Sequence, residues 1–177
     1  MNANTLNFST DNEMLAAVNE KDEVIHALTR REIHDRQLRH RAVHILVSDS
    51  QNRILLQKRS AHKDVHPGAW DTSAAGHVDF GETYLHAASR ELLEELGIRV
   101  TSPDNIGRLE ASSENGWEFV EVYHVVHDGP FNPNAHEIES LQLLTVEEVE
   151  TLLHDDQETV TRSFQRVWAI YKDQRAP

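Results

Sequence analysis

Three glutamates in the segment SRELLEELG, residues 89–97, could together bind a divalent cation. A helix surface usually places Lys or Arg four residues after a glutamate, because opposite charges at that spacing attract each other. Here Glu91 is followed at that spacing by Glu95 instead. At about 100° per residue, Glu91, Glu94 and Glu95 share one arc of a helix. Such an arc is either an ordinary solvated face or a carboxylate site for Mg²⁺ or Mn²⁺, which prefer oxygen ligands.

A helix over about residues 83–96 must position these carboxylates. Leu85, Leu92 and Leu96 recur at helical spacing, and Gly97 follows where a glycine commonly ends a helix. The leucines lie on the side opposite the glutamates. We therefore expect the leucines to pack on the rest of the protein and Glu94 to face solvent.

Strand-like segments before and after this helix predict a small α/β domain with a mixed sheet. Two β-branched runs flank the turn residues DSQN, which predicts a hairpin, and two later runs are split by SSENG. Thr145 and Glu148 fit a capping box that opens a short helix, and a last helix is expected to begin near Glu158. A sheet with one central helix and further helices after it suits a layered fold. The predicted strands are residues 41–48, 53–59, 106–111 and 117–126.

Length, charge and cysteine content limit the range of functions. The 177 residues suit one domain, which we place at residues 19–177 behind a loose tail of residues 1–18. A net charge of −13 and a pI near 5.3 argue against a DNA partner or an anionic membrane, since both need a basic surface. The chain has no cysteine, which excludes disulfides and thiolate metal sites. No segment approaches the roughly 20 apolar residues of a membrane span, so we expect a soluble cytoplasmic protein.

The segment GHVDFGETYLHAASRELLEELGI, residues 76–98, fills every specified position of the Nudix box. Those positions are Gly76, Glu82, Arg90, Glu91, Leu92, Glu94, Glu95, Gly97 and Ile98. A match of this length is far more specific than a short glycine motif. The chain therefore resembles the Nudix hydrolases, and the resemblance implies an α/β/α sandwich.

The resemblance also implies the parts of an active site. In that family the box binds Mg²⁺ or Mn²⁺. By position, the metal ligands here would be Glu91, Glu94 and Glu95, with the carbonyl oxygen of Gly76 as a further one. Two more residues of the box, Arg90 and Glu82, would hold these carboxylates in orientation.

The reaction implied by the resemblance is attack of water on a phosphorus atom of a diphosphate linkage. A bound cation neutralises the diphosphate and lowers the pKa of a water molecule. One of the box glutamates, or Glu137 in NAHEIES, accepts the proton of that water, and members of the family differ in which one does so. The substrate is expected to be a small molecule such as a nucleoside diphosphate derivative. The group beyond the diphosphate stays open because specificity lies in loops outside the box, and a homodimer stays open as well.

Residues 40–77 resemble a subgroup of the same superfamily, the type I isopentenyl-diphosphate isomerases. In that subgroup two basic residues four positions apart hold the substrate's diphosphate, and here they would be Arg59 and Lys63. The isomerases also bind a metal through histidines and acidic residues. His40 and His77 sit in similar places, and His34 and Glu121 in approximate ones, while Phe119 replaces a second acid. Whether these residues form a second metal site stays open at this point.

Two departures from that subgroup favour hydrolysis over isomerisation. Ala75 stands where the isomerases carry a cysteine that takes part in proton transfer, and an alanine methyl group cannot exchange a proton. The isomerases also have an eroded Nudix box, whereas this one is complete. An isomerase-like enzyme is therefore the alternative function. A non-catalytic module that binds nucleotides or diphosphates is a third, disfavoured because no box glutamate is lost.

Overall fold

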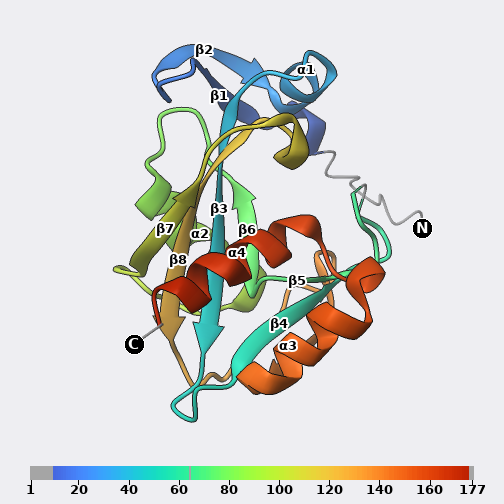
Figure 1. Cartoon of the computed structure of the whole chain (residues 1–177). Coiled ribbons are helices and arrows are strands. Elements are labelled where there is room, and N and C mark those ends of the chain that lie inside the picture. The colour runs from blue at the N-terminus through green and yellow to red at the C-terminus, as the bar shows by residue number, and fades with distance from the viewer. Residues whose placement is uncertain (1–9, 64, 176–177) are drawn as a thin grey trace, which may run out of the picture.

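A mixed sheet of seven strands forms the centre of the protein within residues 10–63 and 65–175, which the computed structural model describes (Figure 1). The path through the sheet is β5-β4-β3-β8-β7, with β6 also paired to β3 and β9 to β4. The pair β3·β8 is parallel and the other pairs are antiparallel. The strands are β3 (His40–Ser48), β4 (Ile54–Arg59), β5 (Trp70–Asp71), β6 (Ala74–His77), β7 (Asp104–Leu109), β8 (Glu118–Val126) and β9 (Ile138–Leu144).

Helices cover both faces of this sheet. Side chains alternate along β3, so that Val43 and Ile45 pack with α2 (Tyr84–Leu96) on one face. Leu46 packs on the other face with the core residues of α3 (Val146–Asp155) and α4 (Arg162–Asp173). The predicted α/β/α sandwich and its mixed sheet are therefore confirmed.

The helix that carries the glutamates begins and ends where its sequence signals predict. The Thr83 hydroxyl accepts a hydrogen bond from the His86 N–H, and Gly97 ends the helix in the left-handed conformation with φ of 70°. The predicted orientation is wrong in part, because Leu85 is 40% exposed while Glu91 and Glu95 are buried. The buried stripe is formed by Ala87, Ala88, Glu91, Leu92, Glu95 and Leu96.

The predicted hairpin and the capping box of the later helix are also confirmed. The strands β3 and β4 pair next to their turn, with Val47 opposite Leu55. The helix α3 is capped by Thr145, which forms the expected box with Glu148. The last helix begins later than predicted, at Arg162. The strand β9, which the sequence did not predict, pairs along the length of β4.

A small N-terminal unit packs beside the end of the sheet where β3 begins (Figure 1). It consists of β1 (Met14–Val18), β2 (Val24–Thr29) and α1 (Arg30–Asp35), and β1 and β2 form an antiparallel pair. The prediction of a loose tail up to residue 18 is thus wrong for Met14–Val18, because four of these five side chains are buried. Successive side chains of β1 pack on opposite sides, one set against Ile33 and the other against Phe119. Residues 1–9 of that predicted tail lie outside the described residues.

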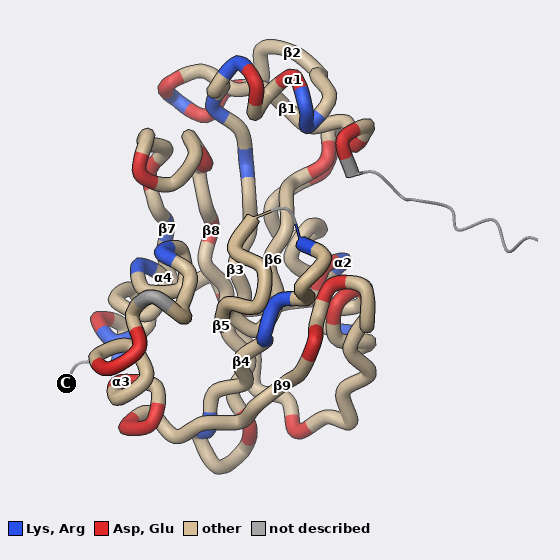
Figure 2. Tube along the Cα trace, turned by 90° about the vertical axis from the view of Figure 1, so that its right-hand side faces the viewer, with Lys and Arg blue, Asp and Glu red and all other residues tan. Residues whose placement is uncertain are grey.

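Three short 3-10 helices complete the described elements, at Thr10–Asn12, Ser113–Asn115 and Gln157–Thr159. Acidic and basic positions are scattered over the trace and are not divided between two halves of the molecule (Figure 2). Among the described residues, no helix has the length and apolar content that crossing a membrane requires.

Candidate active site

Two carboxylates are buried between α2 and the sheet. The side chains of Glu91 and Glu95 belong to residues only 7% and 5% exposed, although ionisable groups are rarely buried without partners. Gly76 on β6 makes room for the first of them, because an added Cβ at Gly76 would stand 2.0 Å from Glu91 Oε1. A side chain at position 76 would therefore force the Glu91 carboxylate to move.

Arg90 connects the acidic residues of the motif. Its Nη1 atom donates to Glu91 Oε1 at 2.6 Å and to Glu94 Oε2 at 3.1 Å. Its Nε and Nη2 atoms donate to the two carboxylate oxygens of Glu82 at 3.1 and 2.9 Å, and Nη2 also donates to the His77 carbonyl oxygen. One guanidinium thus fixes three acids and one strand, which agrees with the orienting role expected for Arg90 and Glu82.

Glu95 is held by neutral donors instead. Its Oε2 atom accepts from the Gln57 side-chain amide at 2.9 Å and from the Ala75 N–H at 3.2 Å. Gln57 was not predicted as part of the site. The signal that could have found it is a polar side chain in the apolar run ILLQKR, where a buried amide needs a partner.

Burial raises the pKa of both buried carboxyls. For Glu91 the charge and hydrogen bond of Arg90 oppose the effect of burial and only partly offset it. For Glu95 the nearby charge of Glu91 adds to burial. The site therefore favours additional positive charge, and its hard oxygen donors suit Mg²⁺ or Mn²⁺. The third glutamate, Glu94, lies at the open side with a side chain 56% exposed, as predicted.

Three histidines gather at the neighbouring end of the sheet. His34 comes from α1, His40 begins β3 and His77 ends β6. Their ring centroids are 5.1 to 5.3 Å apart, and one potential ligand nitrogen from each lies within 4.8 Å of the other two. Among the described residues, these histidines approach one another this closely, whereas the carboxylate oxygens of the three glutamates do not.

The tautomer of His40 suits a ligand. Its Nδ1 atom lies 3.0 Å from the Leu38 carbonyl oxygen, which can only accept, so Nδ1 carries a proton and Nε2 is the nitrogen that faces Glu118. The ring is 1% exposed, and Nε2 has no hydrogen-bond partner in the described structure. A buried ring nitrogen without a hydrogen bond is costly, and binding of a cation would remove that cost.

Glu118 is the acidic residue at this cluster. Its Oε1 atom lies 3.5 Å from both His40 Nε2 and His77 Nε2. Burial opposes ionisation of His77, but hydrogen bonds to Glu118 and Glu13 and the charges of these acids raise the pKa of His77 to about 9. Burial and the other two histidines lower the pKa of His34 to about 4.

Glu121, whose place beside these histidines the sequence left open, bonds to other residues. Its carboxylate accepts from the Asn105 amide at 2.9 Å and from the Tyr123 hydroxyl at 2.5 Å. Glu118 and Glu121 are three residues apart on β8, and residues at an odd spacing in a strand lie on opposite faces. The parallel pairing of β3 and β8 sets His40 opposite Glu118, and sequence alone does not give that register.

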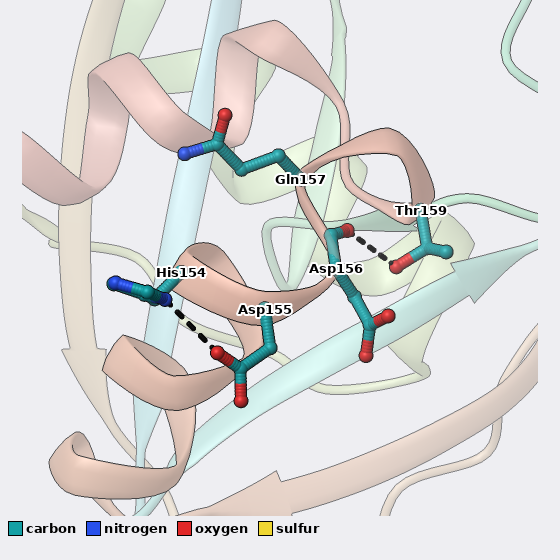
Figure 3. Close-up of a pocket in the computed structure, with 5 residues that line it drawn as sticks. All are labelled: His154, Asp155, Asp156, Gln157 and Thr159. Carbon is teal, nitrogen blue, oxygen red and sulfur yellow. Dashed lines mark hydrogen bonds and ion pairs between the residues drawn. The ribbon is translucent and has the colours of Figure 1, made fainter.

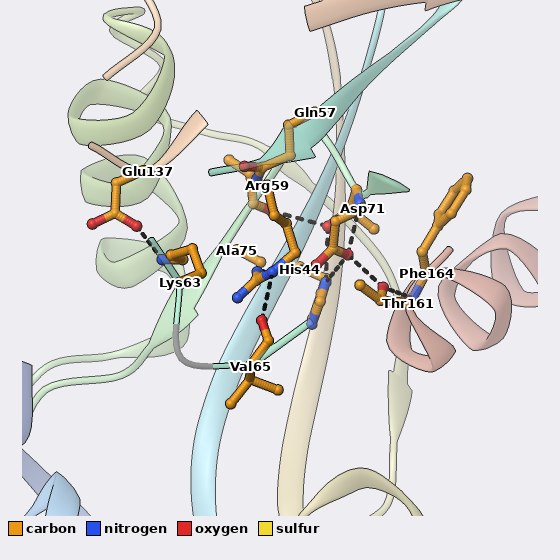
Figure 4. Close-up of polar contacts among 12 residues, drawn as sticks. His44, Gln57, Arg59, Lys63, Val65, Asp71, Ala75, Glu137, Thr161 and Phe164 are labelled. Carbon is orange, nitrogen blue, oxygen red and sulfur yellow. Dashed lines mark hydrogen bonds and ion pairs between the residues drawn. The ribbon is translucent and has the colours of Figure 1, made fainter. Parts of the chain in front are cut away.

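The two basic residues expected to bind a diphosphate lie on β4 and in the turn after it. Arg59 Nη1 donates to Asp71 Oδ2 at 3.2 Å, and Lys63 forms an ion pair with Glu137 (Figure 4). The structure thus brings Glu137 and Lys63 together. It also gives each cation an acidic partner that the sequence did not predict.

A surface hollow at the end of α3 is lined by His154, Asp155, Asp156, Gln157 and Thr159 (Figure 3). It lies across the sheet from α2, because α2 and α3 pack on opposite faces. His154 and Asp155 form an ion pair of 2.9 Å there, and the Thr159 hydroxyl donates to the Asp156 carbonyl oxygen. The side chains of His154 and Asp155 are exposed and paired with each other. We therefore place no chemistry in it.

Comparisons with known proteins agree with the resemblance of the motif. The model of the NUDIX domain family matches residues 38–164. An uncharacterized Nudix hydrolase of Escherichia coli strain K12, YfcD, is 36% identical over 137 residues, covering 77% of this chain and 76% of that protein. A Pseudomonas aeruginosa Nudix hydrolase, PA4841, is 35% identical over 139 residues, covering 78% and 82%. The crystal structure of DR0079 from Deinococcus radiodurans superposes with a TM-score of 0.78 at 29% identity, covering 90% of this chain and 99% of that one.

Proposed function

This chain belongs to the Nudix hydrolase family, and from that premise we propose that it cleaves a diphosphate linkage with Mg²⁺ or Mn²⁺ as cofactor. The observation that carries the proposal is the buried pair of carboxylates, Glu91 and Glu95, held between Gly76 and Arg90. Two buried acids with raised pKa values are unfavourable in a protein that needs only to fold. They are favourable in one that holds a divalent cation.

The residues of the box divide into ligands and positioning groups. Glu91, Glu94 and Glu95 would hold the cation, together with the carbonyl oxygen of Gly76. Arg90 fixes the orientation of Glu91 and Glu94 through its forked donors, and Glu82 in turn holds the guanidinium. When bound, the divalent cation supplies neutralisation of the charge on the diphosphate.

The proposed step transfers a phosphoryl group to water. The water oxygen forms a bond to phosphorus, the bridging P–O bond breaks, and its electron pair leaves with the departing phosphate group. The proton of the water passes to a carboxylate. The candidates are Glu94, whose side chain is exposed, and Glu137, whose side chain is partly exposed. Arg59 and Lys63 would bind the non-reacting oxygens of the diphosphate. The substrate is then a small molecule such as a nucleoside diphosphate derivative.

A second cation site is the finer proposal that the histidine cluster supports. We infer that His34, His40, His77 and Glu118 hold a transition-metal ion, because imidazole nitrogens and one carboxylate suit such an ion better than Mg²⁺. The cluster also supports the resemblance to the isomerase subgroup. Isomerisation stays the alternative function, disfavoured because Ala75 has no proton to exchange.

The test is product analysis with Glu94→Gln and a matched control. The protein is incubated with Mg²⁺ and a pooled panel of diphosphate compounds, including isopentenyl diphosphate, and products are identified by mass spectrometry. We expect products that have gained the mass of water, and a loss of at least about a hundredfold in rate for Glu94→Gln. Glu147→Gln, an exposed glutamate in the first turn of α3, should keep the full rate. Equal rates for wild type and Glu94→Gln would refute the site. Conversion of isopentenyl to dimethylallyl diphosphate at unchanged mass would establish the alternative.

A further inference from the structure

The two cations proposed to bind the diphosphate differ in how firmly their acidic partners hold them. Arg59 is paired with Asp71, a residue 3% exposed, whereas Lys63 is paired with Glu137, whose side chain is 29% exposed (Figure 4). Burial decides how easily an ion pair exchanges, because a buried carboxylate left alone is costly and a solvated one is not. The Lys63 pair can therefore open, and the Arg59 pair cannot open without that cost.

Asp71 is also fixed by groups other than Arg59. Its Oδ1 atom accepts from the Thr161 hydroxyl at 2.9 Å and from the Thr72 N–H at 2.8 Å. The guanidinium is held on a second side, where Arg59 Nε donates to the Val65 carbonyl oxygen. Arg59 is thus a cation fixed in place before any ligand binds.

The backbones of Lys63 and Glu137 are tied to one residue while their side chains stay partly in solvent. The Ser60 N–H donates to the Glu137 carbonyl oxygen at 2.9 Å, and the Lys63 N–H donates to the Ser60 carbonyl oxygen at 3.1 Å. Ser60 is buried. The ion pair can therefore open by rotation of two side chains, with no movement of the chain.

The pair lies beside the buried carboxylates. The Asn134 N–H donates to the Glu95 carbonyl oxygen, and the Glu137 N–H donates to the Asn134 carbonyl oxygen, each at 2.9 Å. The main chains of Glu95 and Glu137 are thus joined through Asn134, which places Glu137 near the buried carboxylates.

We propose that Lys63 exchanges its ion-pair partner when substrate binds, so that the diphosphate takes its ammonium group and the Glu137 carboxylate is released next to Glu95. This exchange rests on the diphosphate site of the proposed function. A diphosphate carries more charge than one carboxylate and also bonds to the fixed Arg59, so it competes well for the ammonium group. Glu137 is then unpaired only while substrate is present. An acid occupied by Lys63 in the free enzyme becomes available to the reaction at the moment that it is needed.

Binding of a non-hydrolysable diphosphate tests the exchange without turnover. Methylenediphosphonate is titrated calorimetrically, in excess Mg²⁺, into wild type and the variants Glu137→Gln, Lys63→Met and the two combined. Removing the competing carboxylate should tighten binding about two- to fivefold, the value of a partly exposed ion pair. In the Lys63→Met background the same Glu137→Gln change should give no gain, because the competition acts only through Lys63.

Glu139→Gln is the matched control. Glu139 lies two residues after Glu137 and is paired with a lysine of its own, Lys58, at 2.8 Å. The substitution Glu139→Gln removes the same charge as Glu137→Gln. It should leave the affinity unchanged. Equal tightening by Glu139→Gln, or a gain from Glu137→Gln that persists in Lys63→Met, would overturn the exchange.

Turnover separates the exchange from the proposed reaction. With a substrate found in the panel, Glu137→Gln should lower KM and kcat together, whereas Lys63→Met should chiefly raise KM. The predicted binding pattern without hydrolysis of any diphosphate would support the exchange and refute the reaction. Absence of methylenediphosphonate binding by wild type and by all variants would refute the diphosphate site, and the exchange with it.

Discussion

The carboxylate of Glu91 occupies the space that a side chain on Gly76 would need. An added Cβ would lie 2.0 Å from Glu91 Oε1 and 2.2 Å from Cδ, far inside any contact that real Cβ atoms make. The strand that carries Gly76 and the helix that carries Glu91 therefore meet at a proposed metal ligand. The first residue of the motif is a steric requirement of a later one, in addition to any role of its carbonyl oxygen.

Gly76→Ala should displace Glu91 and lower both stability and the affinity for Mg²⁺. Overpacking at such a contact costs about 1–3 kcal/mol, measured by chemical denaturation. Mg²⁺ should raise the melting temperature of wild type and raise that of the variant much less, because binding to the folded state alone stabilises it.

Gly116→Ala separates this effect from a general loss of stability. Gly116 has a φ of 70° and nothing within 4 Å of an added Cβ, so alanine there strains the backbone by about 1–2 kcal/mol without a clash. That variant should keep the full response to Mg²⁺. If Gly76→Ala also kept it, the close contact between Gly76 and Glu91 would have no role in metal binding.

Arg90→Lys should reduce turnover far more than stability. Lysine keeps the charge beside the buried Glu91 but cannot donate at once to Glu82, Glu91 and Glu94 from a planar fork. We expect a loss of about 1 kcal/mol in stability and at least about tenfold in kcat. Chemical denaturation and steady-state kinetics measure the two effects.

Arg108→Lys is the control for this change. Arg108 also bonds to two acids, Asp22 and Glu110, each at 3.1 Å, but it lies outside the proposed site. The Arg108→Lys variant should lose about as much stability as Arg90→Lys and keep the wild-type kcat. An equal fall in kcat for both variants would show that Arg90 acts only on the fold.

Local signals in the sequence predicted the helix that carries the site, whereas long-range pairing decided its surroundings. Thr83 and Gly97 mark the ends of α2 because caps are properties of a few neighbouring residues. The burial of Glu95 depends on Gln57, which lies 38 residues away and on another element. A helical wheel cannot reveal such a partner, so the glutamates looked solvent-facing.

Strand register also determined contacts that the sequence did not reveal. The strand β9 mixes Ser, Gln and Leu and lacks a clear pattern of its own, but it pairs with six residues of β4. Glu118 belongs to the histidine cluster because β3 and β8 pair in parallel with His40 opposite Glu118. Local propensity predicts that strands exist, and it does not specify which residues of two distant strands are opposite each other.

His34→Gln should abolish high-affinity Zn²⁺ binding and leave the Mg²⁺ response of the carboxylate site intact. His34 is the exposed member of the cluster, so the substitution removes a ligand without opening the core. Zn²⁺ is titrated calorimetrically in excess Mg²⁺. The Mg²⁺ occupies the carboxylate site, so that the measured heat comes from Zn²⁺ binding to the imidazoles. We expect wild type to bind Zn²⁺ at least about tenfold more tightly than the variant.

His26→Gln is the matched control for this experiment. His26 is an exposed histidine on β2 of the same N-terminal unit, and it does not belong to the cluster. Its loss should leave Zn²⁺ binding unchanged. If both variants bound Zn²⁺ as wild type does, the cluster would be a packed group of histidines. In that case Nε2 of His40, which has no hydrogen bond in the described structure, would have to be satisfied by water or by the Glu118 carboxylate 3.5 Å away.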